Sequence, residues 1–154
     1  PFCGRWYTQT EKPIRENYIK TGKVRMIYRD FAFLGTESTE AAEAAECSKD
    51  QGKFAAYHDA LFDVEQKDAK ENNGDMDRAL FLKIAKDSDM NVPKFTECYD
   101  NNQYASVVLE SRKKASAVGV QGTPATFVNG TEVQGGAQPY ATYQTLFESI
   151  LAEK

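Results

Sequence analysis

The chain has 154 residues, of which 41% are apolar, 12% aromatic and 27% charged, a balance that excludes global disorder. Its net charge of −4 excludes the broad basic surface that nucleic-acid binding needs. We therefore expect no nucleic-acid partner. No run of 18 apolar residues occurs, so we also expect no membrane span.

The N-terminal part of the chain predicts a helix followed by a strand. Apolar residues recur loosely at helical spacing over 3–21, where Pro13 should kink the helix or leave a carbonyl unpaired. The β-forming residues of 24–31 predict a buried strand. At its end we expect Arg29 and Asp30 to form a structural ion pair or hydrogen bonds. The alternative for Asp30 is a buried acid near a redox site.

Residues 38–118 read as a helical block. Ser38 or Thr39 is a suitable cap for its first helix, and Asn91 for a later one. The polar stretch 67–75 predicts an exposed loop inside the block.

The remainder of the chain changes in character. Residues 119–124 form a turn-rich segment, and Asn129-Gly130 is a strong signal for a hairpin between strands at 125–129 and 131–134. A C-terminal helix is predicted over 140–152. The expected order is therefore helix, strand, helical block, hairpin and helix.

The residues with reactive side chains are few. Cysteines stand at positions 3, 47 and 98, an odd number without short spacing, so a zinc site that includes His58 is disfavoured. His58 lies on an apolar helical stripe, which favours a packed histidine over a catalytic one. The single histidine also argues against a Cys–His or Ser–His hydrolase.

Five short segments follow one another in a characteristic order. They are PFCGRWY at 1–7, TGKVR leading to YRDF at 21–31, QGKF with YHD at 51–59, GVQGTP at 119–124 and GAQPY at 136–140. Taken together, they resemble the DsbA-like thiol:disulfide oxidoreductases of the thioredoxin-fold superfamily, and the resemblance covers nearly the whole chain.

The resemblance implies an α/β fold. Residues 1–37 and 119–154 would form the thioredoxin-like core, and 38–118 an all-helical insertion. The family's active site is a C-x-x-C motif at the start of the first helix, and Cys3 matches its second cysteine. On this template the central strand and the nucleophilic cysteine would lie immediately before Pro1.

The resemblance also implies a peptide-binding loop. Thr123-Pro124 matches the family's cis-proline loop, whereas the residues alone favour a trans proline that starts a strand. Gly122, Thr123, Pro124 and Phe2 are the predicted substrate-binding residues. The backbone before the proline would hydrogen-bond an extended substrate.

Cys47 and Cys98 are either two buried thiols or a structural disulfide. The resemblance favours the disulfide, because the family occupies mostly oxidising compartments and some members carry a second pair in this block. It places the protein in the periplasm or outside the cell, with any export signal removed before Pro1. No metal or organic cofactor is implied.

The predicted function is disulfide formation in exported proteins, with Cys3 as the second cysteine of the redox pair. The partners would be cysteine-containing polypeptides and a redox protein that resets the pair. The alternative is a redox-inactive thioredoxin-fold module that only binds peptides. A residue other than cysteine before Pro1 would favour that alternative.

Overall fold

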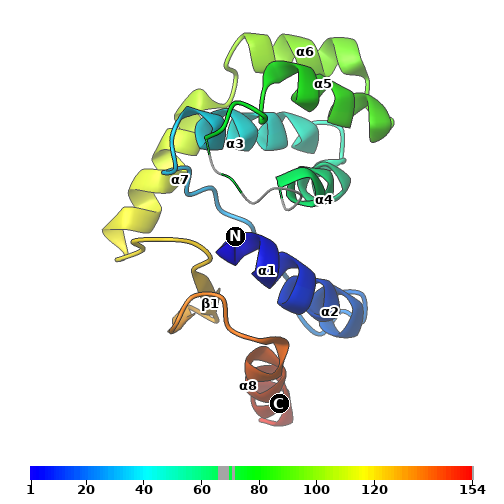
Figure 1. The fold of residues 1–154 in the computed structure, drawn as a ribbon. Coiled ribbons are helices and arrows are strands. Elements are labelled where there is room, and N and C mark those ends of the chain that lie inside the picture. The colour runs from blue at the N-terminus through cyan, green and yellow to red at the C-terminus, as the bar shows by residue number, and fades with distance from the viewer. Residues whose placement is uncertain (66–69, 71, 154) are drawn as a thin grey trace. The chain divides into compact units, whose positions relative to one another are not determined.

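The computed structural model describes residues 1–65, 70 and 72–153. Two compact units make up the chain: Pro1–Arg29 with Val120–Lys154 forms unit 1, and Asp30–Gly119 forms unit 2 (Figure 1). Within the described part of the chain, every helix falls short of the length and apolar character that a membrane span requires.

Unit 1 begins with a continuous helical segment. It consists of α1 (Phe2–Trp6), the π-helical η1 (Tyr7–Glu11), α2 (Lys12–Ile14) and the π-helical η2 (Arg15–Ile19). Pro13 lies in the first turn of α2 and has no N–H to donate. Wider π turns flank it on both sides, and the backbone stays helical through Lys12. The predicted helix is confirmed, and Pro13 coincides with a change of hydrogen-bonding pattern rather than with its end.

The strand predicted at 24–31 is wrong, since residues 24–33 form neither helix nor strand. The segment is also not buried as predicted, since its residues alternate between half-buried and exposed. Val24 and Met26 are half-buried, whereas Arg25 and Ile27 are exposed. A strand also needs a hydrogen-bonded neighbour. Among the described residues, the two strands present pair only with each other.

These two strands form the predicted hairpin. β1 (Thr126–Val128) pairs antiparallel with β2 (Thr131–Val133). The turn residues Asn129 and Gly130 both have positive φ, at 50° and 85°, as the primed hairpin turns require. The predicted C-terminal helix is confirmed as α8 (Tyr140–Ala152).

The core of unit 1 joins the N-terminal helical segment to α8. Its most buried members are Ile14, Tyr18, Tyr143 and Phe147. The rings of Tyr18 and Phe147 meet edge to face at 5.0 Å, and the Tyr18 hydroxyl donates to Glu148 at 2.6 Å. Val128 and Val133 of the hairpin pack against this cluster. The core thereby connects both sequence segments of unit 1.

Unit 2 is helical in its described residues. It contains α3 (Thr36–Lys49), α4 (Phe54–Glu65), α5 (Arg78–Asp87), α6 (Val92–Asp100) and α7 (Ala105–Ala117). Its core is one cluster of buried side chains from α3 to α6 and the turn before α6, in which the largest are Tyr57, Phe81 and Phe95. The division into a thioredoxin-like core of residues 1–37 and 119–154 and a helical insertion of residues 38–118 stays a prediction.

The helix ends of unit 2 test the predicted caps. Asn91 is confirmed, because its side chain accepts the Lys94 backbone N–H at 3.0 Å. The cap at Ser38 or Thr39 is wrong, because α3 already begins after Gly35, whose φ of 113° suits only glycine. The predicted loop at 67–75 lies partly outside the described residues.

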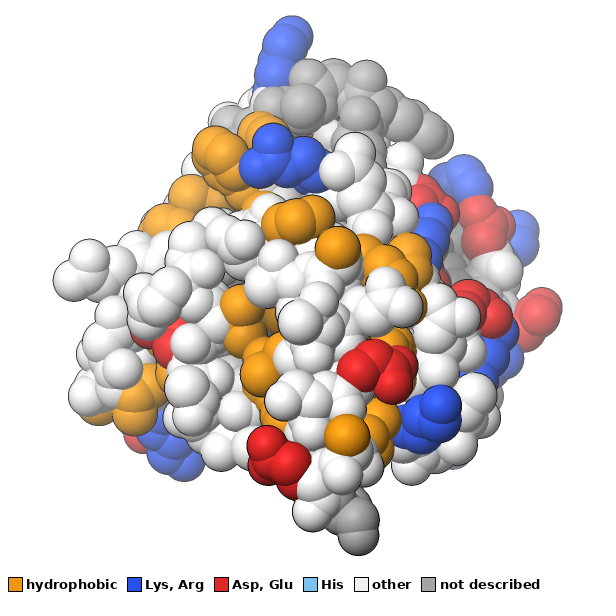
Figure 2. Space-filling view, turned by 90° about the horizontal axis from the view of Figure 1, so that it is seen from below, with side chains coloured by type: hydrophobic (Ala, Val, Ile, Leu, Met, Phe, Trp, Pro, Cys, Tyr) orange, Lys and Arg blue, Asp and Glu red, His pale blue; other side chains and the backbone are white. Residues whose placement is uncertain are grey.

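The surface mixes both signs of charge with apolar side chains. On the face in Figure 2, acidic and basic side chains lie interspersed around a group of apolar ones. The most exposed large apolar residues of unit 1 are Phe2 and Ile27, at 61% and 53%.

Candidate active site

Cys3 lies in the first turn of the N-terminal helical segment. Its side chain is partly exposed. Cys3 does not take part in the disulfide between Cys47 and Cys98. The Arg5 N–H donates to the Pro1 carbonyl at 3.0 Å and closes this turn. The Arg5 guanidinium lies 5.5 Å from the ring centroid of the exposed Phe2. A thiol at this end of a helix is accessible to another molecule.

Trp6 attaches the Cys3 turn to the rest of unit 1. The Trp6 indole N–H donates to the Tyr143 hydroxyl at 3.2 Å, and their rings meet edge to face at 5.9 Å. The Tyr143 hydroxyl also hydrogen-bonds the Thr126 hydroxyl at 2.6 Å. Tyr143 is buried, so this chain of contacts fixes α1 against α8 and β1.

Sequence reasoning did not identify these three side chains as positioning residues. Tyr143 lies within the C-terminal helix predicted over 140–152, and its place there indicates no partner. The spacing of apolar residues indicates the buried face, but no local pattern names the partner of a buried hydroxyl.

A second attachment joins the helical segment to the turn before α8. The buried Thr10 hydroxyl donates to the Gln138 carbonyl at 2.9 Å. The Gln138 side chain in turn donates to the Gly135 carbonyl at 3.0 Å. Gly136 follows with a φ of 67°, and a Cβ on it would lie 3.8 Å from the Pro124 carbonyl oxygen. This turn therefore packs beside the predicted peptide-binding loop.

The loop at 122–124 leads directly into β1. The Thr123–Pro124 peptide bond is cis. All three residues are partly exposed, and a Cβ on Gly122 would meet nothing within 4 Å. In the described part of the chain, no residue forms a hydrogen bond with the Thr123 backbone. The predicted substrate role of this loop stays a prediction.

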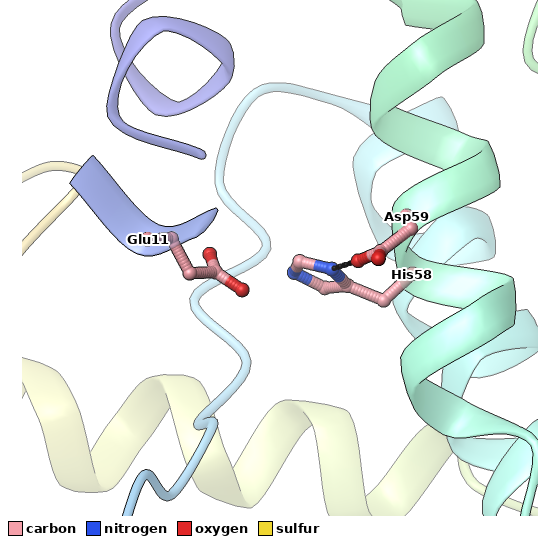
Figure 3. A group of neighbouring side chains, drawn as sticks. All are labelled: Glu11, His58 and Asp59. Atoms are coloured by element: carbon pink, nitrogen blue, oxygen red, sulfur yellow. Dashed lines mark hydrogen bonds and ion pairs between the residues drawn. The ribbon is translucent and has the colours of Figure 1, made fainter. Parts of the chain in front are cut away.

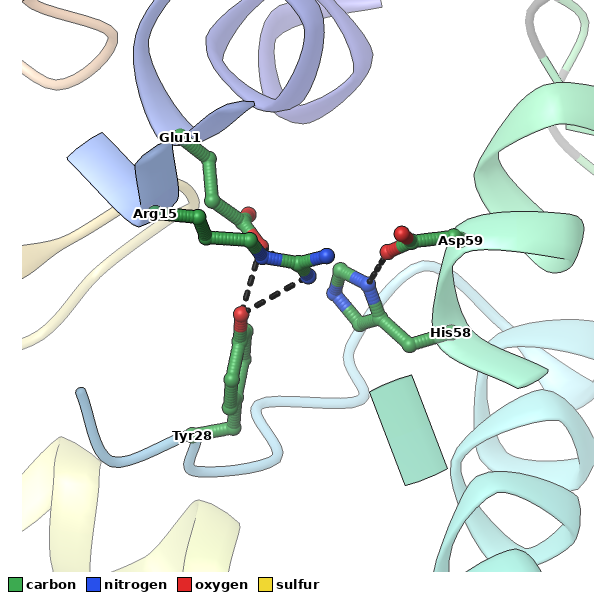
Figure 4. A network of polar contacts seen from close by, with 5 residues as sticks. All are labelled: Glu11, Arg15, Tyr28, His58 and Asp59. Atoms are coloured by element: carbon green, nitrogen blue, oxygen red, sulfur yellow. Dashed lines mark hydrogen bonds and ion pairs between the residues drawn. The ribbon is translucent and has the colours of Figure 1, made fainter. Parts of the chain in front are cut away.

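A buried polar network braces the helical segment that carries Cys3. Glu11 is 2% exposed and forms an ion pair with Arg15 (Figure 4). The Tyr28 hydroxyl donates to the Glu11 carboxylate at 2.5 Å and accepts from Arg15 at 2.9 Å. Burial first, and then the hydrogen bond to Glu11, raise the pKa of Tyr28 above its usual range. Tyr28 therefore stays a neutral donor that compensates a buried carboxylate.

Unit 2 contains the disulfide. Cys47 of α3 and Cys98 of α6 are both buried and are joined by a bond that spans 5.9 Å between their Cα atoms. It ties two helices that lie 51 positions apart in sequence.

His58 of α4 packs as its sequence position indicated. Figure 3 shows its Nδ1 facing Asp59, and the two atoms are 3.1 Å apart. The ring lies 5.5 Å from that of Phe54 and 4.8 Å from that of Phe62. With 12% of its side chain exposed, His58 is mainly a packing residue.

Asp30 forms a carboxyl pair rather than an ion pair. Burial first, and then a hydrogen bond with Glu46, raise the pKa of Asp30 to about 7. Glu46 itself forms an ion pair with Lys49, whereas the neighbouring Arg29 is exposed. The alternative of an acid beside the redox site stays a prediction.

Comparison with known proteins identifies the family. A family model described as Thioredoxin matches residues 1–149. The probable disulfide bond formation protein D of Bacillus anthracis is 28% identical over 134 residues, which cover 84% of this chain and 60% of that protein. A putative protein-disulfide oxidoreductase of Rickettsia conorii is 28% identical over 156 residues, covering 100% of this chain and 54% of that protein. The chain thus spans little more than half the length of these relatives.

A solved structure agrees with this assignment. The reduced form of the disulfide bond oxidoreductase DsbG from Mycobacterium tuberculosis matches with a TM-score of 0.78 and 26% identity, over 97% of this chain and 72% of that one. The two units together therefore form a thioredoxin-like fold with a small sheet and many helices. The chain belongs to the thioredoxin family and, within it, to the DsbA-like thiol:disulfide oxidoreductases.

Proposed function

We propose that the protein forms disulfide bonds in cysteine-containing polypeptides through a C-x-x-C pair whose second cysteine is Cys3. One observation carries the proposal: the family match begins at residue 1 and so includes Cys3, which lies accessible in the first turn of a helix. Unpaired N–H groups at such a helix start stabilise thiolates, the reactive form in disulfide exchange.

The other half of the pair would be a cysteine immediately before Pro1, as the family motif requires. In the oxidised enzyme, a substrate thiolate attacks that cysteine's sulfur, a mixed disulfide forms and Cys3 leaves as a thiolate. A second substrate thiolate then attacks the substrate sulfur of the mixed disulfide, and the enzyme cysteine leaves as a thiolate. The substrate gains a disulfide, and the enzyme pair takes up its two electrons.

The residues around Cys3 support recognition of an extended peptide. Phe2 is 61% exposed and offers an apolar surface next to the thiol. Gly122, Thr123 and Pro124 are partly exposed, and the Thr123 backbone is available for strand-like hydrogen bonds. The contacts through Trp6 hold the Cys3 turn against the strand that this loop enters.

The proposed location is an oxidising compartment, the periplasm or the exterior of the cell. The Cys47–Cys98 disulfide supports this, because such bonds persist where thiols are not kept reduced. A redox partner that accepts the two electrons would return the pair to its disulfide.

Oxidation of a reduced two-cysteine peptide by the complete protein tests the proposal. Wild type, oxidised beforehand, should convert the peptide to its disulfide, whereas Cys3→Ala should not, because without Cys3 the protein has no redox disulfide to pass on. The double variant Cys47→Ala/Cys98→Ala is the control and should keep turnover at a temperature at which circular dichroism shows it folded, because that pair lies in the other unit.

Full turnover by Cys3→Ala would contradict the proposed role of Cys3. Peptide binding without turnover in wild type would favour a redox-inactive peptide-binding module instead.

A further inference from the structure

Thr126 places a hydroxyl on the core-facing side of the hairpin. It is the first residue of β1 and lies two positions after Pro124. Alternation along the strand puts its side chain on the same face as that of Val128, which packs against the core of unit 1. Phe127 between them is 44% exposed on the other face. A hydroxyl that faces a core needs a hydrogen-bond partner.

The partner of Thr126 is a buried tyrosine. The Thr126 and Tyr143 hydroxyls are 2.6 Å apart, and Tyr143 is 2% exposed. The Tyr143 hydroxyl also accepts the Trp6 indole N–H at 3.2 Å. An indole N–H only donates, whereas each hydroxyl both donates and accepts, so the three groups satisfy one another. Two hydrogen bonds thus link α1, α8 and β1 within unit 1.

The two ends of this chain of side chains lie next to the two parts of the proposed site. Trp6 follows Cys3 by three positions in α1, so the two are neighbours on the helix surface. Thr126 follows Pro124 of the peptide-binding loop by two positions. An edge-to-face contact at 5.9 Å between the rings of Trp6 and Tyr143 adds to the hydrogen bonds. The chain therefore fixes the separation between the Cys3 turn and the loop.

That separation matters only for a substrate that touches both parts. A polypeptide that hydrogen-bonds the loop must bring its own thiol to the redox pair at the same time. A misplacement of about 1 Å can slow such a reaction on the order of 100-fold. A small dithiol reacts at the pair without touching the loop.

We propose that Thr126 positions polypeptide substrates, and not small dithiols, for exchange at the pair that contains Cys3. The inference rests on the proposed function. The chemistry is the same for both substrates: two thiols lose two electrons and two protons, and the enzyme disulfide takes them up as two thiols. The Thr126 hydroxyl contributes by holding the loop in register with the Cys3 turn.

Single-turnover oxidation by the complete protein, oxidised beforehand, tests the proposal with a reduced two-cysteine peptide and with dithiothreitol. Thr126→Val keeps the shape of the side chain without its hydroxyl. It should lower the limiting rate with the peptide about tenfold and leave the rate with dithiothreitol unchanged. The peptide concentration that gives half the limiting rate should stay the same, because the loop backbone still binds the peptide.

Three further variants complete the experiment. Thr126→Ser keeps the hydroxyl and should oxidise the peptide as wild type does. Thr131→Val removes an exposed hydroxyl from β2 and is the matched control, with wild-type rates for both substrates. Trp6→Phe breaks the other hydrogen bond of the chain and should reproduce the pattern of Thr126→Val. It decides the test if Thr126→Val does not fold.

Three outcomes would overturn the proposal. The first is equal slowing of both substrates in Thr126→Val, as a merely structural role would give. The second is a wild-type rate with the peptide in Thr126→Val and Trp6→Phe, and the third is slow peptide oxidation in Thr126→Ser. Wild type that oxidises neither substrate would contradict the proposed function itself, and this inference with it.

Discussion

Removal of the Cys47–Cys98 disulfide should destabilise unit 2 strongly. On the chain-entropy relation, a cross-link that closes a loop of 51 residues lowers the entropy of the unfolded chain by about 14 cal/mol/K, or about 4 kcal/mol at room temperature. This is a large share of the ~5–15 kcal/mol by which a domain is usually stable. We therefore expect Cys47→Ala/Cys98→Ala to lower the free energy of unfolding by about 4 kcal/mol.

Urea unfolding with two probes measures this loss. Far-UV circular dichroism reports mainly the helices of unit 2, whereas fluorescence reports Trp6, the only tryptophan, in unit 1. The dichroism midpoint should fall in the double variant and, equally, in reduced wild type. Cys3→Ala is the control and should keep the wild-type midpoint. A loss below about 1 kcal/mol in the double variant would refute the entropy argument.

Two further predictions concern buried polar groups. Tyr143→Phe leaves the Trp6 indole N–H without its acceptor and should cost about 1–3 kcal/mol in urea unfolding, whereas the exposed hydroxyl lost in Tyr140→Phe should cost under about 0.5 kcal/mol. Equal losses in the two variants would contradict the positioning role of Tyr143. Burial and Glu46 raise the pKa of Asp30 from 3.8 to about 7. Between these two values the folded chain holds a proton that the unfolded chain releases. The free energy of unfolding should therefore fall as pH rises from about 4 to about 7. Asp30→Asn should flatten that fall and be more stable than wild type at pH ~8; the same slope in both proteins would contradict the assignment.

Local chemistry explains which elements could be predicted from the sequence. Asn129-Gly130 specifies its own turn, because both residues tolerate positive φ. Asn91 caps α6 with its own side chain. The apolar face of α8 follows from helical spacing alone. Each of these signals lies within a few residues of the structure that it predicts.

The incorrect and missing predictions involve distant partners. Residues 24–31 are rich in β-forming residues, but a strand exists only with a neighbour, and the sequence does not name one. The hydroxyl of Tyr143 meets Trp6 across 137 positions. Gly35 begins α3 earlier than the serine and threonine that looked like its cap. The pairing of Cys47 with Cys98 follows from the family resemblance, because the residues alone also allow two buried thiols.

Peptide mapping of the protein from its native source, alkylated without and with prior reduction, tests the central claim most directly. We predict that a cysteine precedes Pro1, that it forms a disulfide with Cys3 in the oxidised protein, and that this bond opens at lower reductant concentration than the buried Cys47–Cys98 bond. Alkylation of Cys3 without any reduction, together with a residue other than cysteine before Pro1, would contradict the account and leave a peptide-binding module.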